Sequence, residues 1–130
     1  MKRLVLALSS LTLIACGGGG SGFQVKAPSQ GSVVDRLMTM QESFFALIAG
    51  SKTSDEAAAK IDAYCTENQQ AVHATLAEQQ ANMENEEMAA EFQNRSMKLQ
   101  QRAEKLYSNM PNLMEDGKVI EAMDRCRPQD

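Results

Sequence analysis

The sequence has few of the residues from which catalytic and metal sites are usually built. Its 130 residues include no tryptophan and one histidine, His73. A single histidine cannot supply the usual ligand set of zinc or of a di-iron centre. No serine follows the nucleophile-elbow pattern, no thiol has a base partner nearby, and the glycine run at 17–20 precedes no helix that could cradle a phosphate. We therefore expect a protein that is not an enzyme and holds no metal or cofactor.

Glycine and proline are absent from residue 51 to residue 110, and β-branched residues are scarce throughout the chain. Helix-forming residues (Ala, Glu, Gln, Lys, Met and Leu) dominate instead. The composition predicts an all-α domain over residues 32–130, arranged as a small up-down bundle of three to four helices.

The chain also lacks a hydrophobic run long enough for a membrane span. The apolar stretch 4–15 would rise about 18 Å as a helix, which is short against a hydrocarbon core of about 30 Å. It follows the cationic start Lys2-Arg3. This order of a short cationic segment and a short apolar segment predicts that residues 1–15 are a cleaved signal peptide.

The segment Leu13-Ile14-Ala15-Cys16 resembles the lipobox of bacterial lipoproteins. The resemblance covers only the first 16 residues. It implies that the leader is cut before Cys16 and that acyl chains on this residue hold the protein on a membrane. Gly17 is not the aspartate of an inner-membrane retention signal, so the outer membrane and a periplasmic domain are favoured in a bacterium with two membranes. An ordinary signal peptide followed by an incidental cysteine is the alternative.

Residues 16–31 are rich in glycine and serine, so we expect lipidated Cys16 to begin a flexible tether. Loss of Lys2 and Arg3 with the leader changes the formal net charge from −4 to −6. An acidic domain argues against nucleic acid as a partner.

Acylation of Cys16 leaves an even pair of cysteines, Cys65 and Cys126. In an oxidising compartment this pair predicts one disulfide. The bridge would close a loop of about 60 residues and contribute ~4 kcal/mol in the chain-entropy treatment. Two inert buried thiols are the alternative.

Capping residues predict where the first two helices begin. The first begins near Ser32, with Asp35 three residues on, and ends before Gly50. The second begins at Thr53, in a capping box closed by Glu56. The predicted buried face of the first helix is Val33, Leu37, Met40, Phe44 and Leu47, flanked by Val34, Met38, Phe45 and Ile48. The predicted buried face of the second helix is Ala57, Ile61, Cys65, Asn68, Val72 and Leu76.

The order of charges predicts a tight turn within 81–86, because acids cluster directly after it and bases follow further on. A third helix, capped by Asn82 or Asn85, would run to Met110, and a fourth from 111 or 112 to near Arg125. The buried face of the third is predicted to be Met88, Phe92, Leu99, Ala103, Leu106 and Met110. Because Cys65 and Cys126 must approach closely, we expect the second, third and fourth helices to touch one another, with the first at one side.

Four cations of the third helix form a basic stripe: Arg95, Lys98, Arg102 and Lys105. The stripe could contact an anionic polymer or lipid phosphates. The alternative is a solvated flank paired with acids of the second helix, namely Asp55, Asp62, Glu67 and Glu78.

Eight methionines besides Met1 raise a copper(I) hypothesis, through Met38 with Met40, Met110 with Met114, and Met83 near Met88. Ordinary core packing is the alternative. The segment 115–123, EDGKVIEAM, after a helical hairpin is similar to the last helix region of cytochrome b562-like bundles, which implies at most a four-helix architecture. The C-terminal haem-binding histidine of that family is absent here.

The sequence therefore predicts a non-enzymatic lipoprotein of the bacterial envelope that contacts another envelope component. One alternative is a periplasmic carrier that binds haem or copper(I) through methionines and His73. Another is a chaperone-like bundle, which would expose an apolar groove.

Overall fold

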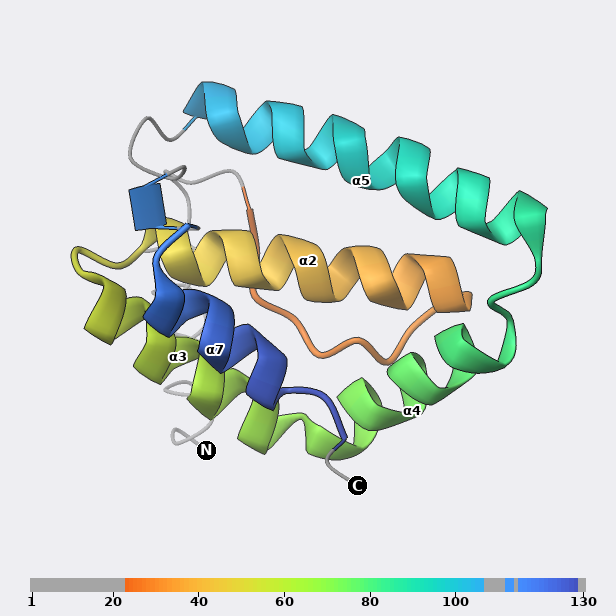
Figure 1. The fold of residues 1–130 in the computed structure, drawn as a ribbon, viewed down its shortest axis with the longest axis horizontal. Coiled ribbons are helices and arrows are strands. Elements are labelled where there is room, and N and C mark those ends of the chain that lie inside the picture. Colours follow the sequence, from red (N-terminus) through yellow and green to blue (C-terminus); the bar gives the residue numbers. More distant parts are fainter. Residues whose placement is uncertain (1–22, 107–111, 114, 129–130) are drawn as a thin grey trace, which may run out of the picture.

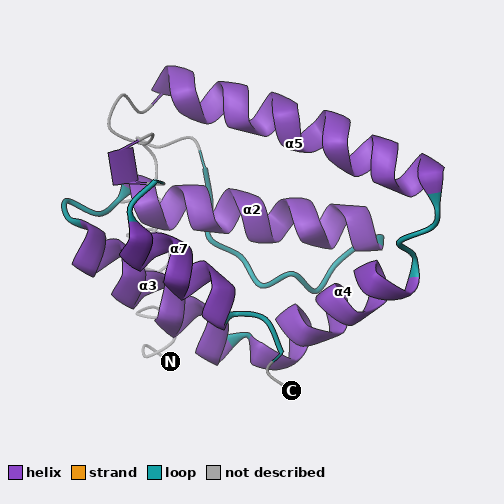
Figure 2. Ribbon diagram, in the orientation of Figure 1, coloured by secondary structure: helices purple, strands orange, loops and turns teal. Residues whose placement is uncertain are grey.

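The computed structural model describes residues 23–106, 112, 113 and 115–128, and over these residues the chain is all-α (Figure 2). The five described helices are α2 (Val33–Ala49), α3 (Ser54–Glu67), α4 (Gln69–Ala81), α5 (Glu86–Leu106) and α7 (Gly117–Arg125). No helix in these ranges is long and apolar enough to cross a membrane. The predicted signal peptide, Cys16 and the methionines at 110 and 114 lie outside the described residues.

Helix α2 is the centre of the fold and packs against α3, α4 and α5, while α7 packs against α3 (Figure 1). The prediction that α5 would join α3 and α7 in one contacting group is wrong, because α5 packs mainly against α2. The apolar stripe of α2 is wide enough to contact α5 on one side and the main core on the other. Val34 and Leu37 meet α5 through Met88 and Phe92, whereas other α2 residues enter the main core.

The predicted ends of the first helix are confirmed. The Ser32 hydroxyl accepts a hydrogen bond from the Asp35 backbone N–H, and the Asp35 carboxylate accepts one from the Ser32 backbone N–H, each at 3.1 Å. This reciprocal pair is a capping box that satisfies two otherwise unpaired donors. Gly50 is the C-cap.

The start of α3 at Thr53 is also confirmed, since the Thr53 hydroxyl accepts a hydrogen bond from the Glu56 backbone N–H. The Glu56 carboxylate, however, accepts from the backbone N–H of Lys52, one residue before the predicted donor. A break at Asn68 separates α3 from α4, so the described helices outnumber the three to four expected. The Asn68 side chain donates to the carbonyl of Tyr64 and thereby competes with the regular helix pattern.

The predicted turn within 81–86 is present between α4 and α5, and Asn85 caps α5 by accepting from the Met88 backbone N–H at 3.0 Å. The start of the last helix was predicted too early. Helix α7 begins at Gly117, because the Asp116 side chain accepts from the Lys118 backbone N–H and so makes Asp116 the N-cap.

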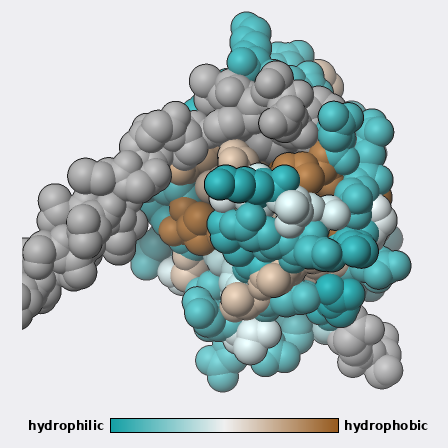
Figure 3. All heavy atoms as spheres, turned by 90° about the vertical axis from the view of Figure 1, so that its left-hand side faces the viewer, coloured by the Kyte–Doolittle hydropathy of each residue, from teal (hydrophilic) through white to brown (hydrophobic). Residues whose placement is uncertain are grey.

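The main core lies between α2, α3, α4 and α7 and includes Leu99 and Ala103 of α5. Cys65 of α3 and Cys126, the C-cap of α7, form the predicted disulfide, with their Cα atoms 5.4 Å apart. On the face drawn in Figure 3, hydrophobic residues form small separate areas among hydrophilic ones.

Residues 23–32 form an ordered strap across the bundle, although residues up to 31 were expected to be a flexible tether (Figure 1). Phe23 is 1 % exposed and its ring packs 6.2 Å from that of Phe45, measured between centroids. Pro28 is also fully buried. The tether prediction is therefore wrong for residues 23–31, because apolar side chains anchor this segment at two points.

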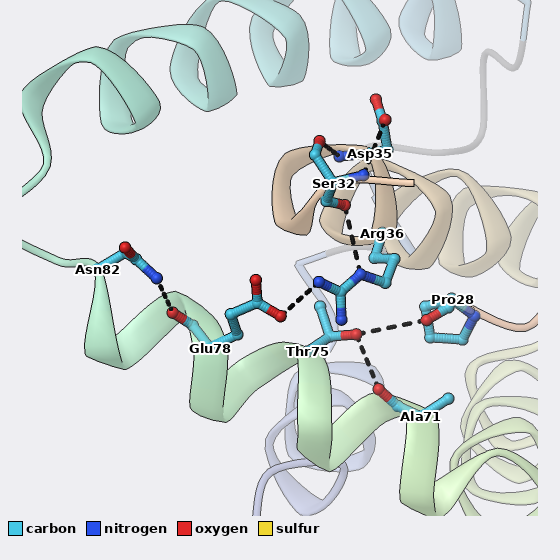
Figure 4. Close-up of polar contacts among 8 residues, drawn as sticks. All are labelled: Pro28, Ser32, Asp35, Arg36, Ala71, Thr75, Glu78 and Asn82. Atoms are coloured by element: carbon cyan, nitrogen blue, oxygen red, sulfur yellow. Dashed lines mark hydrogen bonds and ion pairs between the residues drawn. The ribbon is translucent and has the colours of Figure 1, made fainter. Parts of the chain in front are cut away.

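Side-chain hydroxyls satisfy the backbone of the strap. Buried Ser43 accepts from the Lys26 N–H at 2.9 Å and donates to the Lys26 carbonyl at 3.1 Å. Tyr64 donates to the same carbonyl at 2.6 Å. The hydroxyl of Thr75 lies 2.8 Å from the Ala71 carbonyl and 3.4 Å from that of Pro28 (Figure 4). The strap is thus held by hydrogen bonds as well as by burial.

Candidate functional site

The four predicted basic residues of α5 fall into two groups. Arg95 is engaged within the fold, because its Nη1 donates to Asp35 at 2.9 Å and to Glu91 at 3.0 Å. The hydrogen bond to Asp35, with a smaller contribution from Glu91, raises the pKa of Arg95. This guanidinium ties α5 to the first turn of α2 and is already committed to two carboxylates.

Lys98, Arg102 and Lys105 form the second group, which we call the basic face. Their spacing of four and three residues places them on one side of α5, and all three are exposed. Neither lysine makes an ion pair with a described residue. The Arg102 guanidinium lies over the ring of Phe23, 4.9 Å from its centroid. The basic face is therefore next to the point where the chain enters the domain.

Acids of the second predicted helix have partners other than the basic stripe. Each of three carboxylates pairs with a cation on α7 or α2: Asp55 with Lys118 at 2.7 Å, Asp62 with Arg125 at 2.8 Å, and Glu78 with Arg36 (Figure 4). The prediction that these acids would pair with the stripe is wrong. For Asp55 and Asp62 of α3, the physical reason is that α5 lies on one side of α2, while α3 and α7 lie on the other (Figure 1). Glu78 of α4 pairs with Arg36 because α4 packs against α2.

An apolar groove of ≈ 490 Å³ lies between α5, the end of α4 and α2, and we call it the methionine groove. Its apolar lining is Leu37, Met83, Met88, Ala89, Phe92 and Met97, and its remaining lining residues are polar and uncharged. Leu37 is buried, and Met88 and Phe92 are half-buried against it. Met83 is 71 % exposed and Met97 is 51 % exposed. The groove thus has a packed floor and two solvent-facing thioethers.

Sequence reasoning missed Met97. The predicted buried face of this helix is 88, 92, 99, 103, 106 and 110, and Met97 lies off that seam. The sequence did contain a signal for Met97, because a large apolar residue outside the buried face of a helix is either exposed to solvent or packed against a different element.

Two glutamates are close in sequence or in helical position to residues that line the methionine groove. Glu84 directly follows Met83, and Glu86 precedes Gln93 and Gln100 by seven and fourteen residues, which places all three on one side of α5. Gln93 and Gln100 line the groove. Both glutamates are exposed and neither is ion-paired or hydrogen-bonded through its carboxylate within the described part of the chain. Negative charge therefore borders an uncharged groove.

A second depression of ≈ 640 Å³ lies beside α7 and contains the Cys126 end of the disulfide. Met40, Phe44 and Leu76 line one part of it, and charged residues of α7 line the other. The charged residues are of both signs and include Arg125, which is already paired with Asp62. The methionine groove is the more uniform of the two surfaces.

Among the described residues proposed for copper(I) or haem, Met83 and Met88 both line the methionine groove, whereas the others lie elsewhere in the fold. Met40 is buried in the main core and Met38 is half-buried beside it. Met88 and Met97 are nine residues apart on α5, or about 14 Å along its axis, which suits an elongated ligand better than a single ion. His73 is not among the residues that line either depression. Over the described ranges, no three His, Cys, Asp or Glu side chains group in a way that could hold a metal.

Comparisons with protein-family models, with curated proteins and with solved structures gave no match to this chain.

Proposed function

We propose that this chain is a non-enzymatic lipoprotein of the bacterial envelope, anchored in the outer membrane through acyl chains on Cys16, with its helical domain on the periplasmic side. The cationic start, the short apolar segment and the lipobox-like Leu13-Ile14-Ala15-Cys16 support this proposal. The domain acts by contacting another envelope component. In this proposal α3 and α4 count as one helix bent at Asn68, so that the domain is a four-helix up-down bundle.

The observation that carries the proposal is the position of Phe23. Its side chain is buried, so only residues 17–22 separate the lipid-bearing residue from the folded domain. Seven Cα-to-Cα steps span at most about 25 Å. The part of the domain around Phe23 is therefore the part that an anchor at Cys16 holds nearest to the membrane.

Electrostatics select which side of the domain faces the lipid. The mature chain carries a formal net charge of −6, so anionic headgroups repel the domain as a whole. The basic face, with Arg102 on the Phe23 ring, lies at the attachment point. Lys98 and Lys105 can approach lipid phosphates to within the screening length of about 8 Å at physiological salt. We propose that the basic face lies against the headgroups.

The test combines two measurements on the full chain purified from bacterial membranes and reconstituted into vesicles. Mass spectrometry of the N-terminal peptide reports whether Cys16 carries acyl chains. Amine-reactive labelling then reports the accessibility of Lys98 and Lys105, with Lys118 of α7 as the internal control. In vesicles with about 30 % anionic lipid, we expect labelling of Lys98 and Lys105 to slow about threefold or more relative to zwitterionic vesicles, and to recover in 0.5 M salt.

The two results are independent. An unmodified thiol at Cys16 overturns the membrane anchor. A lipidated Cys16 with equal labelling of Lys98, Lys105 and Lys118 in both kinds of vesicle leaves the anchor standing and overturns the proposed orientation.

A further inference from the structure

We infer that the methionine groove binds a basic amphipathic helix of another envelope protein. The inference rests on the proposed interaction role and names the chemistry of the partner. The groove is bounded by α5, the end of α4 and Leu37 of α2, and none of its lining residues is charged.

The floor and the walls of the groove differ in a way that suits an incoming apolar surface. Leu37, Met88 and Phe92 form a packed floor that belongs to a small cluster of its own. Met83 and Met97 stand above it, 71 % and 51 % exposed. Methionine side chains are flexible and polarizable, so exposed thioethers can adjust to apolar side chains of different shapes. Large exposed apolar residues that border one groove mark an interaction surface rather than scattered surface residues.

The charge of the residues around the groove indicates which charge a partner should carry. Glu84 adjoins Met83 in the chain, and Glu86 lies on the same side of α5 as the groove residues Gln93 and Gln100. Both glutamates are exposed and make no ion pair with a described residue. The three cations of the basic face are spaced along a different side of α5. With about 100° of rotation per residue, Glu86 lies about 120° around the helix from Lys98. A partner with lysine or arginine next to its apolar residues would therefore be attracted here, and an anionic surface would be repelled.

The length of the groove fits a short helix. From Met88 to Gln100 the lining residues of α5 extend about 18 Å, or about three helical turns. An amphipathic helix of that length presents apolar anchors at positions i, i+3 or i+4, and i+7, which is the usual mode of helix-in-groove recognition. A single metal ion would leave most of this length uncovered.

The experiment uses the full mature chain in nanodiscs of zwitterionic lipid, with methionine methyl groups labelled for NMR and assigned by single Met→Leu variants. The probe is a synthetic 14-residue leucine–lysine peptide with an amphipathic helical pattern. We expect the methyl signals of Met83, Met88 and Met97 to shift as the peptide is added, while that of core Met40 stays in place. Empty nanodiscs measure how much peptide binds to lipid alone.

Matched variants test the two halves of the argument. Glu84→Gln with Glu86→Gln should weaken binding about fivefold at low salt and remove most of its salt dependence. The control, Glu67→Gln with Glu115→Gln, makes the same change in net charge elsewhere and should leave the affinity unchanged. Met83→Gln with Met97→Gln should weaken binding about tenfold, because it replaces the apolar walls.

Several outcomes overturn the inference. They are equal binding of a leucine–glutamate peptide, equal loss in the two glutamate pairs, or shifts of Met40 as large as those in the groove. Shifts of the groove methionines with protein concentration and no peptide would assign the groove to a second copy of the chain, and saturating shifts with copper(I) alone to a metal. The acylation of Cys16 is measured separately on the same sample. The proposed membrane anchor and the proposed peptide binding in the groove can therefore be contradicted independently of each other.

Discussion

The phenol of Tyr64 donates a hydrogen bond of 2.6 Å to the backbone carbonyl of Lys26, which lies 38 residues earlier in the chain. The contact joins α3 to the strap that precedes α2. The Ser43 hydroxyl donates to the same carbonyl and accepts from the Lys26 N–H, so one backbone unit of the strap is held from two helices. Through this unit, a segment with no regular secondary structure becomes part of the folded domain.

Replacement of Tyr64 by Phe should lower the free energy of unfolding by about 1 kcal/mol, the net contribution of one hydrogen bond of this kind. The ring and its edge contact with Phe44 would remain. Urea unfolding followed by circular dichroism measures the change. Ser43→Ala should cost more, because it removes the acceptor of the Lys26 N–H and one of the two donors to the Lys26 carbonyl. Equal stability of the wild type and Tyr64→Phe would contradict the assigned role of the phenol.

Replacement of Phe23 by Ala should lower the free energy of unfolding by about 3 kcal/mol or more, since it empties a fully buried aromatic site. Val25 provides a control from the same segment. It is 48 % exposed, and Val25→Ala should change stability by less than about 0.5 kcal/mol. If both variants unfold at the same urea concentration, residues 23–32 do not contribute to the domain as the structure implies.

Removal of the Cys65–Cys126 bridge should lower the free energy of unfolding by about 4 kcal/mol in the chain-entropy treatment, because the bond joins residues 61 positions apart. The comparison is between the oxidised wild type and Cys65→Ala with Cys126→Ala, both unfolded in urea. The double variant is also the control for effects of the reductant itself, because reductant should not change its free energy of unfolding. A wild type that loses less than about 1 kcal/mol on reduction would show that the bridge adds little to stability.

Local signals predicted the features that depend on neighbouring residues. Ser32 and Asp35 lie three residues apart, and their side chains cap each other's backbone, so the start of α2 could be read directly from the sequence. Asn85 caps α5 in the same local way. The pairing of Cys65 with Cys126 followed from the small number of cysteines rather than from any contact.

Features that depend on distant residues could not be read in this way. The strap contains glycine, serine and proline, which are typical of a tether, and its order comes from Tyr64 and Thr75, far along the chain. The packing of α5 on α2 depends on the wide apolar stripe of α2, which contacts elements on two sides. The apolar face of a single helix does not indicate which other helix will cover it. Of the candidate site, the sequence predicted the cations of α5 and the local pairing of Arg95 with Glu91, but not that Arg95 also pairs with Asp35 of α2. The methionine groove arises only when α4, α5 and α2 meet.

Acid should destabilise the domain partly through Asp35. Hydrogen bonds from the Ser32 backbone and from Arg95 hold the pKa of Asp35 below its usual value of 3.8. The unfolded chain therefore takes up this proton at a higher pH than the folded chain does. The stabilisation is complete above about pH 4 and is lost as the pH falls through the lower pKa of the folded state. The Glu56 carboxylate, held by the Lys52 backbone N–H and by Lys60, contributes with the same sign.

The variant that tests this contribution is Asp35→Asn, which keeps an oxygen that can accept from Ser32 but cannot titrate. Unfolding free energies measured by urea titration between pH 7 and about pH 2.5 should fall less steeply below pH 4 for Asp35→Asn than for the wild type. Glu67→Gln is the matched control, since Glu67 makes no ion pair with a described residue. Like Asp35→Asn, it removes one carboxylate, but it breaks no ion pair with a described residue. Identical slopes for Asp35→Asn and the wild type would mean that the link between α2 and Arg95 of α5 does not depend on the charge of Asp35.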